Sequence, residues 1–150
     1  EQLRSVRVPF CSEPDLSLTL DLFTIGKDVM SAALRAERVQ KLQVAEHFQN
    51  LANVFMAFPA AHRDKDRDRL TFLVAKTDSL IQSLQGSAVF ATVLGKRLEK
   101  QFFLLIAQVL KQKELMAGGA QRELGYATIV SAAGFLEGYA ESLRAQARKD

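Results

Sequence analysis

Residues 70–86 read LTFLVAKTDSLIQSLQG, and this stretch gives the clearest structural signal in the chain. Its apolar positions recur every three or four residues, which places them on one face of an α-helix. The glycine at position 86 closes the pattern, as glycines commonly do after a last helical turn. We therefore predict an amphipathic helix whose stripe faces a core. The stripe consists of Leu70, Leu73, Thr77, Leu80 and Leu84.

The segment before this helix, residues 60–68, alternates in charge and predicts a solvated loop. Its carboxylates would favour the positive end of the following helix. A second pattern covers residues 27–58, where Phe48 and Phe55 belong to a stripe at helical spacing. It predicts one helix of about 30 residues, ended by Pro59, because a proline disfavours the α conformation in the residue before it.

Residues 87–116 predict a further helix, closed by Gly118 and Gly119. It is apolar on most sides, so we expect it to lie centrally among several neighbours. The last predicted helix covers residues 121–147 and carries a stripe of small side chains. That stripe consists of Ala127, Ser131, Gly134 and Gly138.

The N-terminal part of the chain is less regular. Residues 1–12 have no helical period and predict a short extended arm. Ser12 and Asp15 then suit the start of a helix, with Ser12 as its cap. Residues 16–25 allow two interpretations. Their leucines alternate with polar residues as in a strand, but leucine favours helix and three of the apolar residues share one helical face.

Together these patterns predict an all-α fold, an antiparallel up-and-down bundle of four or five helices. We expect the arm at residues 1–12 to precede a single domain at residues 13–150, a usual size for one domain. Apolar residues make up 48% of the chain and charged residues 25%, which is ordinary globular composition. The chain begins at Glu1 rather than at methionine, so we expect it to be a processed product or a fragment.

The sequence contains no recognisable catalytic motif, and we expect a protein that is not an enzyme and needs no cofactor. Cys11 is the only cysteine, has no partner in view, and gives a weak preference for the cytoplasm. His47 and His62 have no second ligand at helical spacing, so we predict no metal site. Asp21, within the leucine run, is the acid that we expect to be half-buried.

One cationic cluster stands out, formed by Lys96, Arg97 and Lys100. The net charge of the chain is only +3, so a nucleic-acid or membrane-surface binder ranks third among the functions considered. The small-residue stripe allows close packing inside the chain, a seat for a partner helix, or a pocket for an apolar ligand. A solvated helix face is the simpler interpretation of the cationic cluster.

The leading functional prediction is a helical protein–protein interaction module, such as an adaptor, a scaffold or a secretion-type chaperone. Its partner would be another protein, with a homo-oligomer as one option. The alternative is a sensory or ligand-binding domain with an apolar pocket near Gly134 and Gly138. This ranking depends on the long amphipathic helices and on the lack of catalytic motifs.

Overall fold

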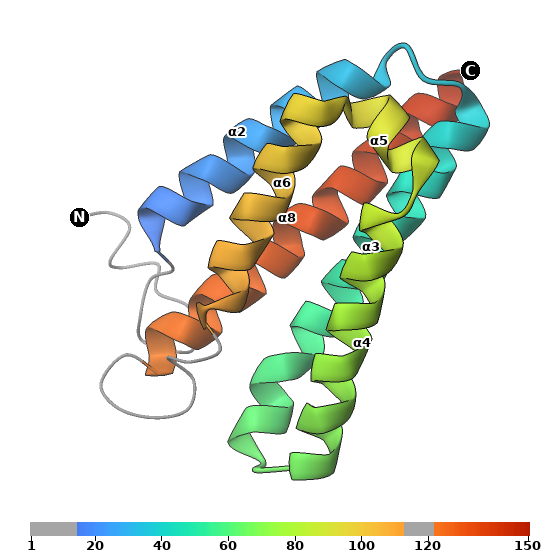
Figure 1. Cartoon of the computed structure of the whole chain (residues 1–150). Helices are drawn as coiled ribbons and strands as arrows, with labels where there is room; N and C mark the ends of the chain where they lie inside the picture. Colours follow the sequence, from blue (N-terminus) through green and yellow to red (C-terminus); the bar gives the residue numbers. More distant parts are fainter. Residues whose placement is uncertain (1–14, 113–121) are drawn as a thin grey trace.

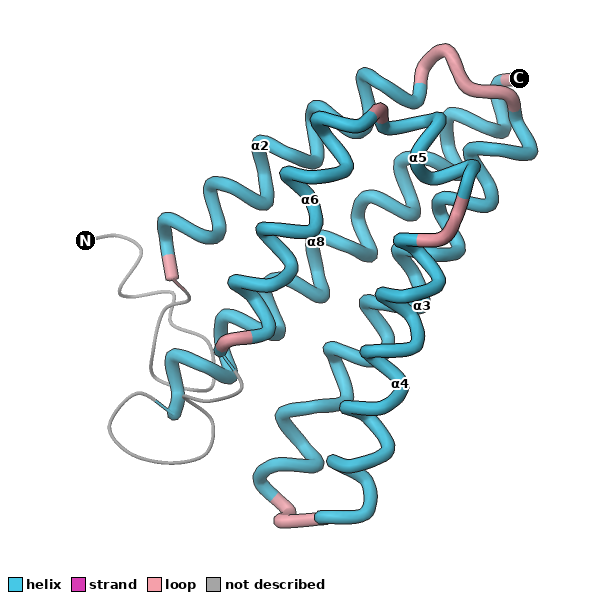
Figure 2. The backbone as a smooth tube through the Cα atoms, in the orientation of Figure 1, coloured by secondary structure: helices cyan, strands magenta, loops and turns pink. Residues whose placement is uncertain are grey.

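The structure is a computed structural model that describes residues 15–112 and 122–150. In these residues every regular element is a helix, so the predicted all-α class is confirmed (Figures 1 and 2). The predicted arm at residues 1–12, Cys11, Gly118 and Gly119 lie outside the described residues. The helices are α2 (Leu16–Ala33), α3 (Arg38–Arg63), α4 (Arg67–Gln85), α5 (Ala88–Leu94), α6 (Lys96–Leu110) and α8 (Arg122–Lys149).

Residues 16–25 belong to α2, so the helical interpretation of the leucine run holds. Asp15 is the N-cap, and its Oδ1 accepts a hydrogen bond from the backbone N–H of Leu18 at 3.1 Å. The backbone N–H of Asp15 donates to Oγ1 of Thr128 at 3.0 Å. This second bond ties the start of α2 to α8, and it gives the cap a tertiary role that a local pattern does not reveal.

The predicted helix over residues 27–58 is wrong in both of its boundaries. The chain breaks at residues 34–37, between α2 and α3, and α3 continues through Pro59 to Arg63. Glu37 caps α3 in a reciprocal arrangement, in which Oε1 of Gln40 accepts from the backbone N–H of Glu37 at 2.9 Å. Residues 34–37 contain no glycine or proline that would mark this break. The new helix is started by the reciprocal cap at Glu37.

Pro59 stays inside α3 because its surroundings outweigh its local cost. A proline in a helix interior removes one hydrogen bond and costs about 3 kcal/mol. Here Pro59 is buried, together with Phe55, Phe58 and Ala61 on the same stretch of helix. Burying one large apolar side chain contributes about 1.5–3 kcal/mol, so two phenylalanines offset the proline.

The predicted helix over residues 87–116 is divided at Gly95 into α5 and α6. Gly95 has φ 84° and ψ 155°, a combination that is almost restricted to glycine. The chain therefore turns sharply between two helices that a continuous apolar pattern made look like one. The expected central position belongs instead to α3 and α8, which pack along each other over most of their length, while Leu104 on α6 is exposed.

The core is centred on a group of aromatic rings contributed by four helices. Phe48 of α3 lies edge-to-face with Phe102 of α6 and Tyr139 of α8, at centroid distances of 5.5 and 5.4 Å. Phe90 of α5 joins them, 5.8 Å from Phe48. Such pairs favour one relative placement of the rings, so this group positions α8 against the other helices.

The C-terminal end of the chain, in α8 and directly after it, is held by polar contacts to α2 and α3. The buried Lys41 forms a salt bridge with Asp150, in which Nζ lies 2.7 Å from Oδ2. Nε2 of Gln146 donates to the carbonyl oxygen of Met30 at 3.1 Å. These contacts hold α8 beside the C-terminal half of α2, where the site described next is found.

Candidate functional site

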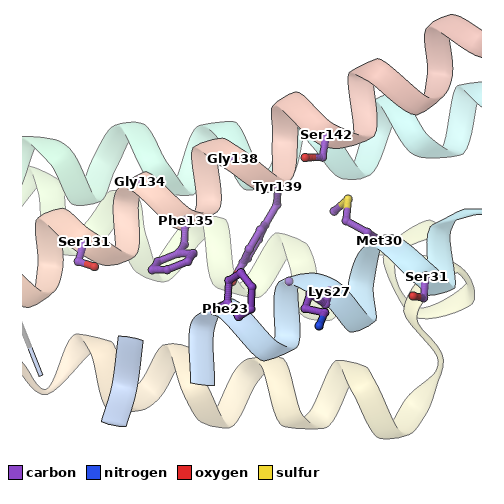
Figure 3. Close-up of a pocket in the computed structure, with 11 residues that line it drawn as sticks. Phe23, Lys27, Met30, Ser31, Ser131, Gly134, Phe135, Gly138, Tyr139 and Ser142 are labelled. Atoms are coloured by element: carbon purple, nitrogen blue, oxygen red, sulfur yellow. The ribbon is translucent and has the colours of Figure 1, made fainter. Parts of the chain in front are cut away.

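A groove with a volume of about 700 Å³ runs between α2 and α8 (Figure 3). On the α2 side it is lined by Phe23, Lys27 and Met30, and most of its surface is apolar. The rings of Phe23 and Phe135 lie between the two helices, as Figure 3 shows. The groove is therefore an apolar trough whose charged group is the single ammonium of Lys27.

The α8 side of the groove is built from three of the four small residues predicted as a stripe. Ser131, Gly134 and Gly138 line it, whereas Ala127 is buried and is not part of the lining. A Cβ atom placed on Gly134 or on Gly138 would meet nothing within 4 Å. These glycines therefore do not serve close packing inside the chain, and they leave open space along the outer face of α8.

The two helices are joined at the base of the groove by Tyr139. Its hydroxyl donates a hydrogen bond to the carbonyl oxygen of Leu22, and burial raises the pKa of Tyr139 above its usual range. Gly26 lies under the ring, where an added Cβ would come within 3.0 Å of Cε1 of Tyr139. Of the glycines near the groove, Gly26 is the one that allows close approach.

α2 has a second apolar face, which points outward beside the groove. Its inner face, including Leu18 and Leu22, is buried in the core. Four further large apolar side chains are between 54% and 66% exposed, and they share the opposite side of the helix: Leu16, Leu20, Phe23 and Leu34. They are four of the nine large hydrophobic side chains that are exposed among the described residues. This concentration is unusual for a surface that faces only water.

Sequence reasoning missed this outward face, although a signal for it was present. The alternation of Leu16, Leu18, Leu20 and Leu22 with polar residues suggested a strand. In the helix the first and third of these leucines lie on the outward face, and the other two lie in the core. A period of two in a helix therefore indicated apolar residues on two faces.

The three residues of the predicted cationic cluster lie at the start of α6. Lys96, Arg97 and Lys100 are all exposed. Lys96 and Lys100 line one shallow hollow together. Arg97 lines a different one, which also contains Asp21 and Asp28 of α2. Arg97 therefore shares its hollow with two carboxylates, whereas Lys96 and Lys100 share theirs with Glu99.

Other candidate residues take ordinary positions. His47 is half-buried, its ring lies 6.3 Å from that of Phe90, and burial lowers its pKa despite the neighbouring Glu46. His62 lies beside Tyr126, with ring centroids 6.4 Å apart. Asp21 is exposed, so the expected half-burial is wrong. In residues 15–112 and 122–150 no three His, Cys, Asp or Glu side chains gather as metal ligands would.

Comparison of the chain with models of protein families, with curated proteins and with solved structures found no match. Among the helices of the described segments, none has the length and apolar character needed to cross a membrane. The α2–α8 groove and the outward face of α2 are the surface features of the described residues that bear on function.

Proposed function

We propose that this protein is a non-enzymatic helical interaction module that binds a helix of a protein partner along the α2–α8 groove. The observation that carries this proposal is the outward apolar face of α2, which continues into the groove. Several large apolar side chains exposed together on one face commonly mark an interaction site. A helix is the suitable partner, since amphipathic helices commonly bind in apolar grooves through residues at helical spacing.

The arrangement of the helices belongs to the same proposal. We take the chain to be an antiparallel bundle in which α3 and α8 form the rigid centre and α2 supplies the binding edge. In such a bundle, a groove between two helices is a natural place for one more helix. The glycines on α8 leave its backbone open to close approach.

Site-specific photo-crosslinking tests this function. A photoreactive phenylalanine analogue replaces Phe23 at the groove, and in a second variant it replaces Phe72 on α4. The two side chains are similarly exposed, at 54% and 62%, so they form a matched pair. We expect a defined crosslinked protein only from position 23. Equal products from both positions, or none from either, would contradict the proposal.

A small apolar ligand is the second candidate, favoured by the size of the groove. Its 700 Å³ lies within the range of about 300–1,000 Å³ that is usual for ligand sites. Native mass spectrometry of protein purified from its own cells would show a bound small mass. The variant Gly138→Leu fills open space, so it should lose that mass while its helix content and melting temperature are preserved.

A further inference from the structure

The outward face of α2 follows the spacing of a helix-pairing seam. Six residues lie at alternating intervals of four and three along it: Leu16, Leu20, Phe23, Lys27, Met30 and Leu34. This is the interval pattern of the contact positions in paired helices. Leu34 belongs to the same face because, as the C-cap of α2, it keeps a helical backbone with φ −57° and ψ −32°. Within the described part of the chain, five of these six residues are exposed and Met30 is partly buried, so α2 carries a seam that is open to a second helix.

The spacing of the seam residues is symmetric about residue 25. Reversing α2 about residue 25 keeps every interval, and it pairs aliphatic residues with each other at the two outer levels and a phenylalanine with a lysine at the inner level. Leu16 then meets Leu34 of the second copy, Leu20 meets Met30, and Phe23 meets Lys27. A two-fold axis through this point uses the same surface on both subunits, which is the commonest geometry of protein dimers.

Lys27 determines the direction of pairing. A parallel pair in register would place two Lys27 ammonium groups against each other within an apolar seam, which is unfavourable. The antiparallel pair places each ammonium beside a phenyl ring of the other copy, where a cation–π contact is attractive. In the single chain Nζ of Lys27 already lies 5.6 Å from the centroid of its own Phe23 ring. The lysine is thus positioned for such a contact.

The groove between α2 and α8 has space for a helix that pairs with α2. Gly134 and Gly138 leave open space on α8, so a helix lying along α2 can also contact α8. α2 has 18 residues and is about 27 Å long, and two adjacent helices present a strip about 20 Å wide. The area covered on each copy is about 500 Å², at the small end for specific complexes, so the dimer should dissociate on dilution.

We infer that the helix received by this groove is α2 of a second copy of the chain, antiparallel to the first about a two-fold axis near residue 25. This inference rests on the proposed function and names its partner. The α2 helix of each copy packs in the groove of the other copy. Four helices then meet at the interface: α2 and α8 of both copies.

Sedimentation velocity over a wide concentration range tests the association. We expect a monomer–dimer equilibrium for the wild type that Leu20→Glu shifts at least tenfold towards monomer, because the charge would be buried in the seam. Phe72→Glu is the matched control, since Phe72 is as exposed as Leu20 but lies on α4. A dimer weakened equally by both changes, or by neither, would overturn the inference.

The same experiment separates this inference from the proposed function. A wild type that stays monomeric into the millimolar range overturns the homodimer. If Phe23 then still crosslinks a different protein, the interaction module stands and only its partner was wrongly named. If position 23 captures no protein at all, both proposals fail.

Distances between spin labels test the orientation, in a Cys11→Ser background. Ser17→Cys and Thr24→Cys place labels at exposed positions of α2 outside the seam. In the antiparallel pair the two copies of position 17 are separated along the axis by about 24 Å, and those of position 24 by only about 3 Å. We therefore expect a clearly longer distance for position 17. Equal distances at both positions would indicate a parallel pair and overturn the inference.

Discussion

Gly26 and Gly138 lie on facing helices of the groove, but their surroundings are opposite. Gly26 is covered by the ring of Tyr139, and Gly138 has nothing near the position of its missing side chain. We expect Gly26→Ala to lower the free energy of unfolding by about 1–3 kcal/mol, because the ring must move from a packed position. That movement also strains the hydrogen bond from Tyr139 to Leu22. Urea denaturation followed by circular dichroism measures the change.

Gly138→Ala should have the opposite effect. Alanine in a helix interior is more stable than glycine by about 0.5–1 kcal/mol, and here no contact opposes it. The same denaturation experiment should show a higher midpoint for this variant. A loss of stability would mean that the chain itself fills the groove.

His47 makes stability depend on pH in a defined direction. Burial lowers its pKa in the folded protein, and Glu46 offsets this only in part. The unfolded chain therefore binds a proton more readily, so stability falls as the pH drops below about 6.5. His47→Gln should reduce this loss between pH 7 and pH 5, as measured by thermal unfolding. An unchanged pH dependence would assign the effect to other groups.

The contrast between these glycines shows what a sequence can predict at the scale of a residue. The spacing of Ser131, Gly134 and Gly138 predicted that they share one face, and they do share the groove. It gave no means to decide whether that face is covered. Coverage depends on α2, which is more than 100 residues away along the chain, and Gly26 on that helix was not expected to be the closely packed glycine.

At the scale of an element, the division between α5 and α6 depends on a single backbone conformation. Gly95 has a positive φ of 84° and nothing near its missing side chain, so the cost of a substitution there is purely conformational. We expect Gly95→Ala to lower the free energy of unfolding by about 1–3 kcal/mol. Thermal unfolding measures this, and Gly86→Ala is a suitable control because Gly86 has φ −91°.

Helix boundaries were the least predictable feature of the elements. The cap at Asp66 and the end at Gly86 follow local rules, and the predicted helix between them is present as α4. The break at residues 34–37 was missed because its residues are good helix formers. The helix end predicted at Pro59 was wrong because burial of α3 in the core overrides the local preference of proline to end a helix.

At the scale of the whole molecule, α4 is the least anchored of the long helices. Only Leu73, Thr77 and Leu84 of its 19 residues are buried, and it packs mainly on α3 (Figure 1). Helices with few buried contacts open more often than the rest of a structure. We expect amide hydrogens of α4 to exchange faster than those of α3 and α8, as hydrogen-exchange mass spectrometry would show. Equal protection in all three would contradict this.

The all-α class followed mainly from hydrophobic period, with the helix propensity of leucine favouring a helix over residues 16–25, because these signals report on each helix separately. Which helix faces meet one another depends on contacts between distant segments, such as Phe48 with Tyr139. For this reason the sequence indicated a groove-forming stripe on α8 but not its opposite wall on α2. The outward face of α2 became recognisable only once the inner face had been assigned to the core.

The position of Tyr139 also has an optical consequence. The chain has no tryptophan and only two tyrosines, and Tyr139 lines the groove whereas Tyr126 lies beside His62. In a Tyr126→Phe variant the ultraviolet emission of the protein would come from Tyr139 alone. A helix or ligand entering the groove would change the polarity around that fluorophore, so occupancy could be followed by its intensity without any attached dye.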